Sequence, residues 1–292
     1  MAHVLTHTAA VEALASDPRG LPEAVVVALR DDLPYARFGA VLPDLPYYDA
    51  SARVLLRRLR GGIGPRPPFA TLFHNGAPVA FGLRMAELVA HAALVGRSPG
   101  IAVVAGYFSH LALDRSLRPP VHELVRTLKR PKEHPRVLGR RIEFLQAIAH
   151  LEHRLGRRVL GWGGLSERLR LLKRESFPLR GIGRGLFELV HTASADTVGP
   201  APTKADLDHW VRSLYLLARL LASPLGPRVA DVDRGLMRRV YEDEFDFESV
   251  YEAALERARH HIGCAHAYLE GGVFDRAARE RVFEAIPEGS MD

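Results

Sequence analysis

Apolar residues recur at three- and four-residue spacing along most of the chain, as an α-helix with one buried face requires. Clusters of proline and glycine, such as SDPRGLP and GGIGPRPP, separate these segments. We find no convincing alternation of apolar and polar residues of the kind that marks a half-buried strand. The sequence therefore predicts an all-α protein folded as a single multi-helix domain. The predicted helices cover 8–16, 21–30, 50–60, 79–96, 100–117, 139–155, 164–173, 183–194, 204–222, 231–241 and 247–268.

Length and composition fit this fold class. The chain has 292 residues, of which 47% are hydrophobic, and this is ample to bury a core. A weak seam lies near 195–203, in ADTVGPAPT. We expect a metal-binding helical core over 1–195 and C-terminal helices over 196–292 that pack on the same domain.

The net charge of +6 favours anionic partners such as phosphate esters or lipid headgroups, although a solvated basic helix surface also explains it. The single cysteine, Cys264, allows no intramolecular disulfide, which fits a reducing compartment. The first residues lack the pattern of a secretory signal, and no apolar run reaches the roughly 18 residues of a membrane span. We therefore expect a cytoplasmic protein without a transmembrane segment.

Five acid or imidazole side chains lie in apolar surroundings. Burying such a group without a partner costs several kcal/mol, so buried groups of this kind must meet partners. The five are His7 in VLTHTAAV, Asp44 in FGAVLPDLPYY, His74 in ATLFHNG, and His110 and Asp114 in GYFSHLALDRSL. Polar groups of this type are the natural candidates for a functional site.

His110 and Asp114 are four residues apart, so in a helix they lie on one face. An imidazole nitrogen and a carboxylate at that spacing can share a divalent metal ion. A hydrogen-bonded His–Asp pair inside a helix bundle explains the same spacing. The remaining ligands of a metal site would come from distant segments, and spacing alone does not show that these meet.

The segment GYFSHLALDRSL resembles the signature helix of the zinc-dependent phospholipase C family, whose all-helical fold is shared with single-strand nucleases. Other segments match this family in the same order: LTHTAAVEAL its first helix, FGAVLPDLPYY its metal-binding Pro-Asp turn, LFHNG its next histidine and RRIEFLQAIAHLEHRLG its following helix. The resemblance covers residues 1–155. It implies an all-α fold of the phospholipase C and nuclease type with a set of zinc ligands.

Carried over position by position, the resemblance implies a first zinc site held by Asp44, His74, His110 and Asp114. A neighbouring zinc would use His7 and share Asp114. A third site is altered, because Glu143 matches its glutamate whereas Gly139 and Arg118 stand where the family has histidines.

The altered third site leaves alternatives open. His122 or His134 could replace the missing ligands, although we expect Pro119 and Pro120 to end the helix. Arg118 could instead act as a fixed cation that binds a phosphate oxygen or pairs with Glu143. We expect His150 and His153, three residues apart, on a helix surface.

The resemblance implies a zinc-dependent phosphodiester hydrolase acting on phospholipid headgroup esters. We predict Asp44 and Arg118 as its catalytic residues, with Arg118 standing in for the third metal. Its partners would be a phospholipid or another phosphodiester, with peripheral contact at a membrane surface; nucleic acid is less favoured. The alternative is a degenerate, non-catalytic family member that serves as a helical binding or scaffold protein. A plain helical interaction protein without metal is a third alternative.

Overall fold

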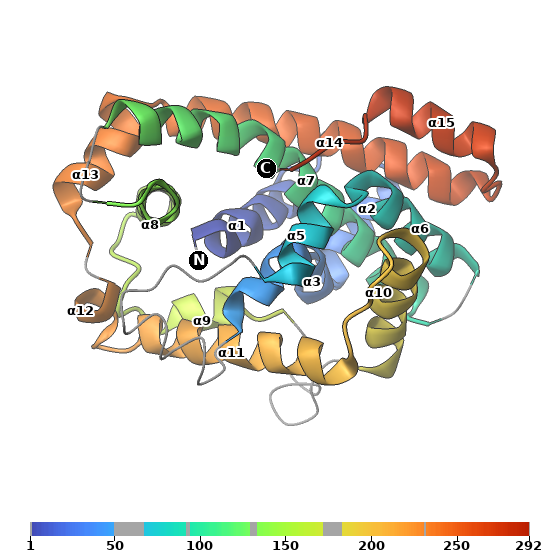
Figure 1. The fold of residues 1–292 in the computed structure, drawn as a ribbon, viewed down its shortest axis with the longest axis horizontal. Helices are drawn as coiled ribbons and strands as arrows, with labels where there is room; N and C mark the ends of the chain where they lie inside the picture. Colours follow the sequence, from blue (N-terminus) through green and yellow to red (C-terminus); the bar gives the residue numbers. More distant parts are fainter. Residues whose placement is uncertain are drawn as a thin grey trace.

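The structure is a computed structural model, and it describes residues 2–49, 67–91, 94–128, 133–171, 183–230 and 232–291. Within these ranges the chain forms helices and their connections, and no strand (Figure 1). The predicted all-α class is therefore confirmed, whereas the phospholipase C type stays a prediction. The predicted helix over 50–60 lies outside the described residues.

The helices follow one another along the chain with short connections. In order they are α1 (Ala2–Ser16), α2 (Glu23–Asp31), α3 (Leu33–Val41), the 3₁₀ helix η1 (Leu42–Tyr48), α5 (Pro68–Asn75), α6 (Pro78–His91), α7 (Arg97–Thr127), α8 (Pro135–Leu155), α9 (Gly164–Arg168), α10 (Arg184–Thr197), α11 (Lys204–Ala222), α12 (Gly226–Ala230), α13 (Arg234–Arg238), the π-helical turn η3 (Arg239–Asp243), α14 (Phe247–Gly271) and α15 (Arg276–Ala285).

The long helix α7 is the centre of the fold, and α3 crosses it at very short range. A Cβ added to Gly106 would lie 1.9 Å from the Ala36 carbonyl oxygen, and one added to Gly39 would lie 2.0 Å from the Val103 carbonyl oxygen. Only glycine at these two positions lets the backbones come this close. The close crossing brings the end of α3, where η1 begins, against the middle of α7.

The prediction that Pro119 and Pro120 end the signature helix is wrong, because α7 continues to Thr127. Each proline in a helix interior removes a backbone hydrogen bond, at a cost of about 3 kcal/mol. Packing offsets this cost, since each fully buried aliphatic side chain contributes about 1.5–3 kcal/mol. Val121 and Leu124 of α7 pack in a separate apolar cluster with Leu138, Ile142, Leu145, Leu236 and Val240.

The main apolar core draws on both halves of the chain. The cluster that contains Leu5 and Phe108 also contains Leu214 and Ile262, and α14 packs along α7. The predicted seam coincides with the connection from α10 to α11, where the Thr203 and Asp206 side chains cap the first turn of α11. The division of the chain at residue 195 stays a prediction. Among the described residues, no helix is long and apolar enough to span a bilayer.

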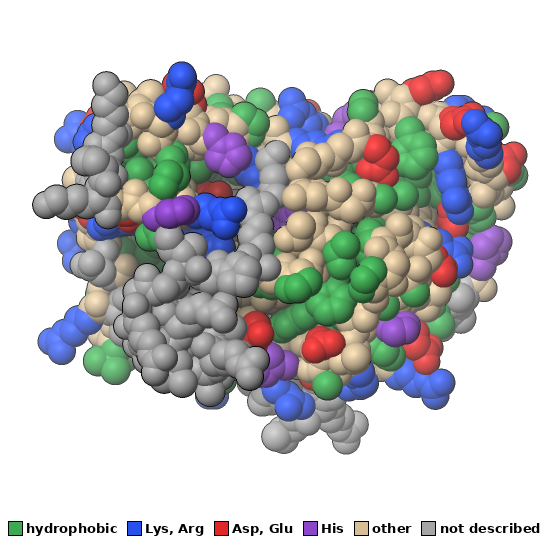
Figure 2. Space-filling model, viewed as in Figure 1, with side chains coloured by type: hydrophobic (Ala, Val, Ile, Leu, Met, Phe, Trp, Pro, Cys, Tyr) green, Lys and Arg blue, Asp and Glu red, His purple; other side chains and the backbone are tan. Residues whose placement is uncertain are grey.

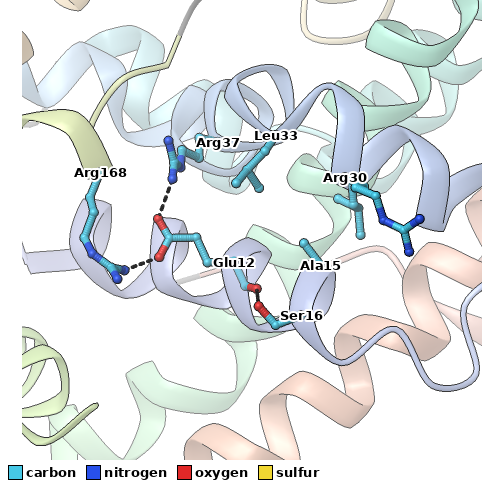
Figure 3. Close-up of a pocket in the computed structure, with 8 residues that line it drawn as sticks. Glu12, Ala15, Ser16, Arg30, Leu33, Arg37 and Arg168 are labelled. Carbon is cyan, nitrogen blue, oxygen red and sulfur yellow. Dashed lines mark hydrogen bonds and ion pairs between the residues drawn. The ribbon is translucent and has the colours of Figure 1, made fainter. Parts of the chain in front are cut away.

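An ion-pair network ties α9 and α3 to α1. The Glu12 carboxylate accepts hydrogen bonds from Arg37, at 2.7 Å, and from Arg168 (Figure 3). A cavity of about 390 Å³ lies beside this network. Because Glu12 already occupies the space between the two guanidinium groups, we interpret the network as a structural tie.

Candidate metal centre

Five buried side chains from four separate elements meet beside α7. They are His7 of α1, Asp44 of η1, His74 of α5, and His110 and Asp114 of α7, and none is more than 1% exposed. Their ligand atoms form two overlapping groups that could hold a metal ion, His7 with His110 and Asp114, and Asp44 with His74 and His110. The residues that the sequence singled out therefore converge in space.

Backbone carbonyls orient two of the three imidazole rings. The Nδ1 atom of His110 lies 2.8 Å from the Ala40 carbonyl oxygen, and Nδ1 of His74 lies 2.6 Å from that of Ala70. A carbonyl only accepts hydrogen bonds, so both Nδ1 atoms must carry the proton. When the rings are neutral, as metal binding requires, their Nε2 atoms present lone pairs to the cluster.

The Nε2 atoms face carboxylate oxygens at a characteristic spacing. His74 Nε2 lies 3.3 Å from Asp44 Oδ1 and 3.4 Å from Asp114 Oδ2, and His110 Nε2 lies 3.3 Å from Asp114 Oδ2. Charge-assisted hydrogen bonds between nitrogen and oxygen are shorter, about 2.7–2.9 Å. Ligand atoms that surround a tetrahedral zinc ion at about 2.1 Å are about 3.4 Å apart. The observed spacing therefore suits a shared metal ion better than direct hydrogen bonds.

His7 lies on the other side of the Asp114 carboxylate. Its Nε2 atom is 3.3 Å from Asp114 Oδ1 and 4.0 Å from Asp44 Oδ2. The His7 ring stacks on the His110 ring with 4.0 Å between centroids. The two oxygens of Asp114 thus face different histidines, which is the arrangement that a carboxylate shared between two ligand groups requires.

The charges of the cluster fit a divalent cation. Two carboxylates and one guanidinium give a net charge of −1 when the imidazoles are neutral. Burial lowers the pKa of His7 to about 4, helped by the nearby His110. Burial also opposes protonation of His74, but the neighbouring carboxylates of Asp114 and Asp44 outweigh it and raise the pKa of His74 to about 9. The carboxylates thus favour a cation between them, here the proton of His74.

Arg118 is the buried cation next to this cluster. Its Nη2 atom donates to Asp114 Oδ2 at 2.8 Å, and only 7% of the residue is exposed. Burial disfavours the charged guanidinium, but Asp114 and Glu143 outweigh burial and raise the pKa of Arg118. The pKa of Asp114 lies well below its usual range, because Arg118 and His110 overcome the opposing effect of its burial. Arg118 is therefore a buried cation held by Asp114, and its role toward a phosphate stays a prediction.

No group of potential metal ligands forms around the altered third site within the part of the chain that the structure describes. Glu143, His122 and His134 belong to neither group of potential metal ligands. His122 is exposed, and because α7 stays helical it lies about 12 Å farther along the axis than Asp114. His134 is exposed and its Nδ1 caps α8 by accepting from the Arg136 backbone amide.

The expectation that His150 lies on a helix surface is wrong, whereas His153 is exposed as expected. His150 is buried, and its Nδ1 atom lies 2.6 Å from Glu248 Oε1 on α14. Tyr241 also donates to this Glu248 oxygen. Glu248 is 98 residues away from His150 in the chain, so helical spacing gave no signal for this pair.

Comparisons of the chain with protein-family models, with curated proteins and with solved structures found no match. The resemblance to the phospholipase C family therefore stays a prediction from the motifs. The candidate centre itself stands on the positions of its five side chains.

Proposed function

We propose that the cluster binds zinc and that the protein is a zinc-dependent phosphodiester hydrolase acting on phospholipid headgroup esters. One observation carries the metal: the nitrogen and oxygen atoms of His74, His110 and Asp114 are spaced 3.3–3.4 Å apart, as ligands of one tetrahedral ion are. Imidazole nitrogens combined with carboxylate oxygens are a typical zinc donor set. The phosphodiester substrate rests on the motif resemblance.

In this proposal Asp44, His74, His110 and Asp114 hold the first zinc ion, and His7 contributes to a second. Zinc supplies a Lewis acid for the phosphate ester and a hydroxide nucleophile near neutral pH. The hydrogen bonds from His110 to Ala40 and from His74 to Ala70 fix the ligand nitrogens before the metal arrives. Arg118, held by Asp114, would supply a fixed positive charge for a phosphate oxygen.

The test is hydrolysis of a chromogenic phosphocholine ester with added zinc. His110→Ala removes a ligand and should abolish turnover. His122→Ala is the matched control, because it makes the same change at an exposed site on the same helix. Equal activity of the wild-type protein and His110→Ala would remove this cluster from the mechanism.

One observation supports the non-catalytic alternative: the cluster is buried, whereas a substrate must reach the metal of a hydrolase. The absence of a described third site points the same way. The double variant Arg118→His, Gly139→His tests this alternative, because it restores both histidines of the family pattern. Position 139 can accept a side chain, since a Cβ there makes only an ordinary contact of 3.5 Å with Val125. An inactive wild-type protein and an active double variant would identify a degenerate member.

A face formed by α11 and the turn that follows it supports peripheral contact with an anionic membrane surface. Leu216, Leu220 and Leu225 are 66%, 37% and 54% exposed. Arg212 and Arg219 lie at helical spacing beside them and are exposed, and residues 209–230 contain no acidic residue. Over the face shown in Figure 2, basic and acidic side chains are interspersed. Binding to phosphatidylserine vesicles that weakens with salt, and no binding to phosphatidylcholine vesicles, would support this contact.

A further inference from the structure

Residues 288–291, here called the clamp segment, attach the last part of the described chain to α5, α6 and α7. Figure 1 shows the chain end, marked C, close to α5 and α7. The Met291 backbone N–H donates to the His74 carbonyl oxygen at 2.9 Å, and the Ser290 hydroxyl donates to Asn75 Oδ1 at 2.6 Å. The Met291 side chain is 1% exposed, so the segment is anchored in the core.

The clamp segment also caps the start of α6. The two oxygens of Glu288 accept hydrogen bonds from the backbone amides of Val79, at 3.1 Å, and Ala80, at 2.6 Å. The first amides of a helix lack partners inside the helix, and Ala77 just before α6 has no side chain that could accept from them. A carboxylate at this position is also favoured by the helix dipole.

A third contact reaches the helix that carries His110 and Asp114. Arg115 follows Asp114 directly on α7, and its Nη2 atom donates to the Gly289 carbonyl oxygen at 3.0 Å. The clamp segment therefore bonds to the backbone of one candidate ligand, His74, and to the chain neighbour of another, Asp114. These contacts join elements whose relative position sets the geometry of the cluster.

We infer that the clamp segment is a positioning element for His74, through which residues distant in sequence pre-organise the metal centre. The inference rests on the proposed metal site. Helix α5 has only 8 residues, and helices this short are not stable on their own. The His74 ring is oriented by a bond to Ala70 inside α5, so its direction depends on the last turn of that helix. The clamp segment fixes that turn from outside.

The experiment uses a matched pair at position 291. Met291→Pro removes the backbone N–H that holds the His74 carbonyl, whereas Met291→Leu keeps this N–H and an apolar side chain. Zinc affinity is measured by competition with a chromophoric chelator, and unfolding of the metal-free proteins by urea. Cobalt(II) replaces zinc to record the ligand-field spectrum, which reports ligand geometry.

We expect Met291→Pro to weaken zinc binding about tenfold or more, as the loss of outer-shell partners of metal ligands does. Met291→Leu should retain the affinity of the wild-type protein. Glu288→Ala should weaken binding in the same direction without introducing a proline, and Glu284→Ala, an exposed change on α15, is its control. The cobalt spectrum should change in Met291→Pro and Glu288→Ala only.

Unchanged zinc affinity and an unchanged cobalt spectrum in both Met291→Pro and Glu288→Ala would overturn the positioning role, even if urea unfolds these variants more easily. If Met291→Pro does not fold, Glu288→Ala alone decides by the same criterion. Absence of zinc binding in the wild-type protein would instead overturn the proposed metal centre, and the positioning role with it.

Discussion

Two buried histidines of this protein, His110 and His150, have carboxylate partners but different arrangements. His110 donates from Nδ1 to a backbone carbonyl and turns Nε2 to Asp114 at 3.3 Å. His150 makes its 2.6 Å bond to Glu248 through Nδ1 itself. In the first pair the contact to the carboxylate is longer than a hydrogen bond of a charged group, and in the second it is as short as one.

The difference separates a group of side chains that could hold a metal ion from a satisfied polar pair in a core. Around Asp114, three imidazole nitrogens converge on the carboxylate at 3.3–3.4 Å, longer than hydrogen bonds of charged groups, beside the 2.8 Å bond from Arg118. The spacing of the three imidazoles leaves room for a cation. Around Glu248, one oxygen accepts from both His150 and Tyr241, so the carboxylate is satisfied by the protein alone. Burial of a histidine beside an acid therefore does not identify a metal site; the number of converging groups and their spacing do.

The largest expected effect comes from Asp114→Ala. It removes the carboxylate that faces all three histidines of the cluster and leaves the Arg118 guanidinium without its 2.8 Å partner. Removing one member of a buried ion pair costs about 3–5 kcal/mol, and we expect a loss near the lower end because Glu143 remains close to Arg118. Urea unfolding of the metal-free protein measures this loss.

The same variant should also lose zinc binding. Ligand at about 1,000 times its dissociation constant stabilises the folded state by about 4 kcal/mol, so zinc should raise the unfolding midpoint of the wild-type protein and not that of Asp114→Ala. Glu248→Ala should keep the full response to zinc. A zinc response that survives in Asp114→Ala would place the metal elsewhere.

Local sequence patterns predicted most of the candidate site. The four-residue spacing of His110 and Asp114 placed both on one helix face, and apolar neighbours marked His7, Asp44 and His74 as buried. What spacing left open was whether these residues meet. Their meeting depends on the crossing of α3 and α7 at Gly39 and Gly106, which is a property of packing between distant segments.

The incorrect predictions have the same origin. The prolines at 119 and 120 predicted a helix end, but burial of Val121 and Leu124 against α8 carries α7 past them. Helical spacing predicted that His150 lies on a helix surface. It could not show the partner Glu248, which belongs to another helix, α14. The clamp segment gave no signal either, since its contacts with α5, a backbone hydrogen bond from Met291 and a side-chain hydrogen bond from Ser290, come from residues more than 200 positions away.

A smaller effect is expected from His150→Leu, which fills the buried position with an apolar side chain but removes the hydrogen bond to Glu248. A buried group that loses its hydrogen-bond partner costs about 1–3 kcal/mol, and partial exposure of Glu248 favours the lower value. Urea unfolding measures the loss of stability. In chelator competition, His150→Leu should bind zinc with the same affinity as the wild-type protein. A weaker zinc affinity in His150→Leu would contradict the separation of the two sites.

The smallest expected effect is the pH dependence that Glu248 contributes. Its burial favours the neutral acid, but hydrogen bonds from His150 and Tyr241 outweigh burial and lower the pKa of Glu248 below its usual value of 4.5. A carboxyl group with a lower pKa in the folded state stabilises that state above the unfolded pKa, and this stability is lost as pH falls through the folded pKa. The free energy of unfolding of the wild-type protein should therefore exceed that of Glu248→Gln most clearly above pH 5. The difference should shrink as pH falls below about 4, because the unfolded state then binds the proton that the folded state resists.

Solvent screening keeps the contribution of Glu248 small, since 35% of its side chain is exposed. Urea unfolding of the two metal-free proteins at pH 6 and at pH 3.5 measures it, and comparison at each pH cancels the titration of every other carboxylate. A difference that stays constant across this range would show that the charge of Glu248 does not stabilise the fold, and the contrast with Asp114 would then rest on geometry alone.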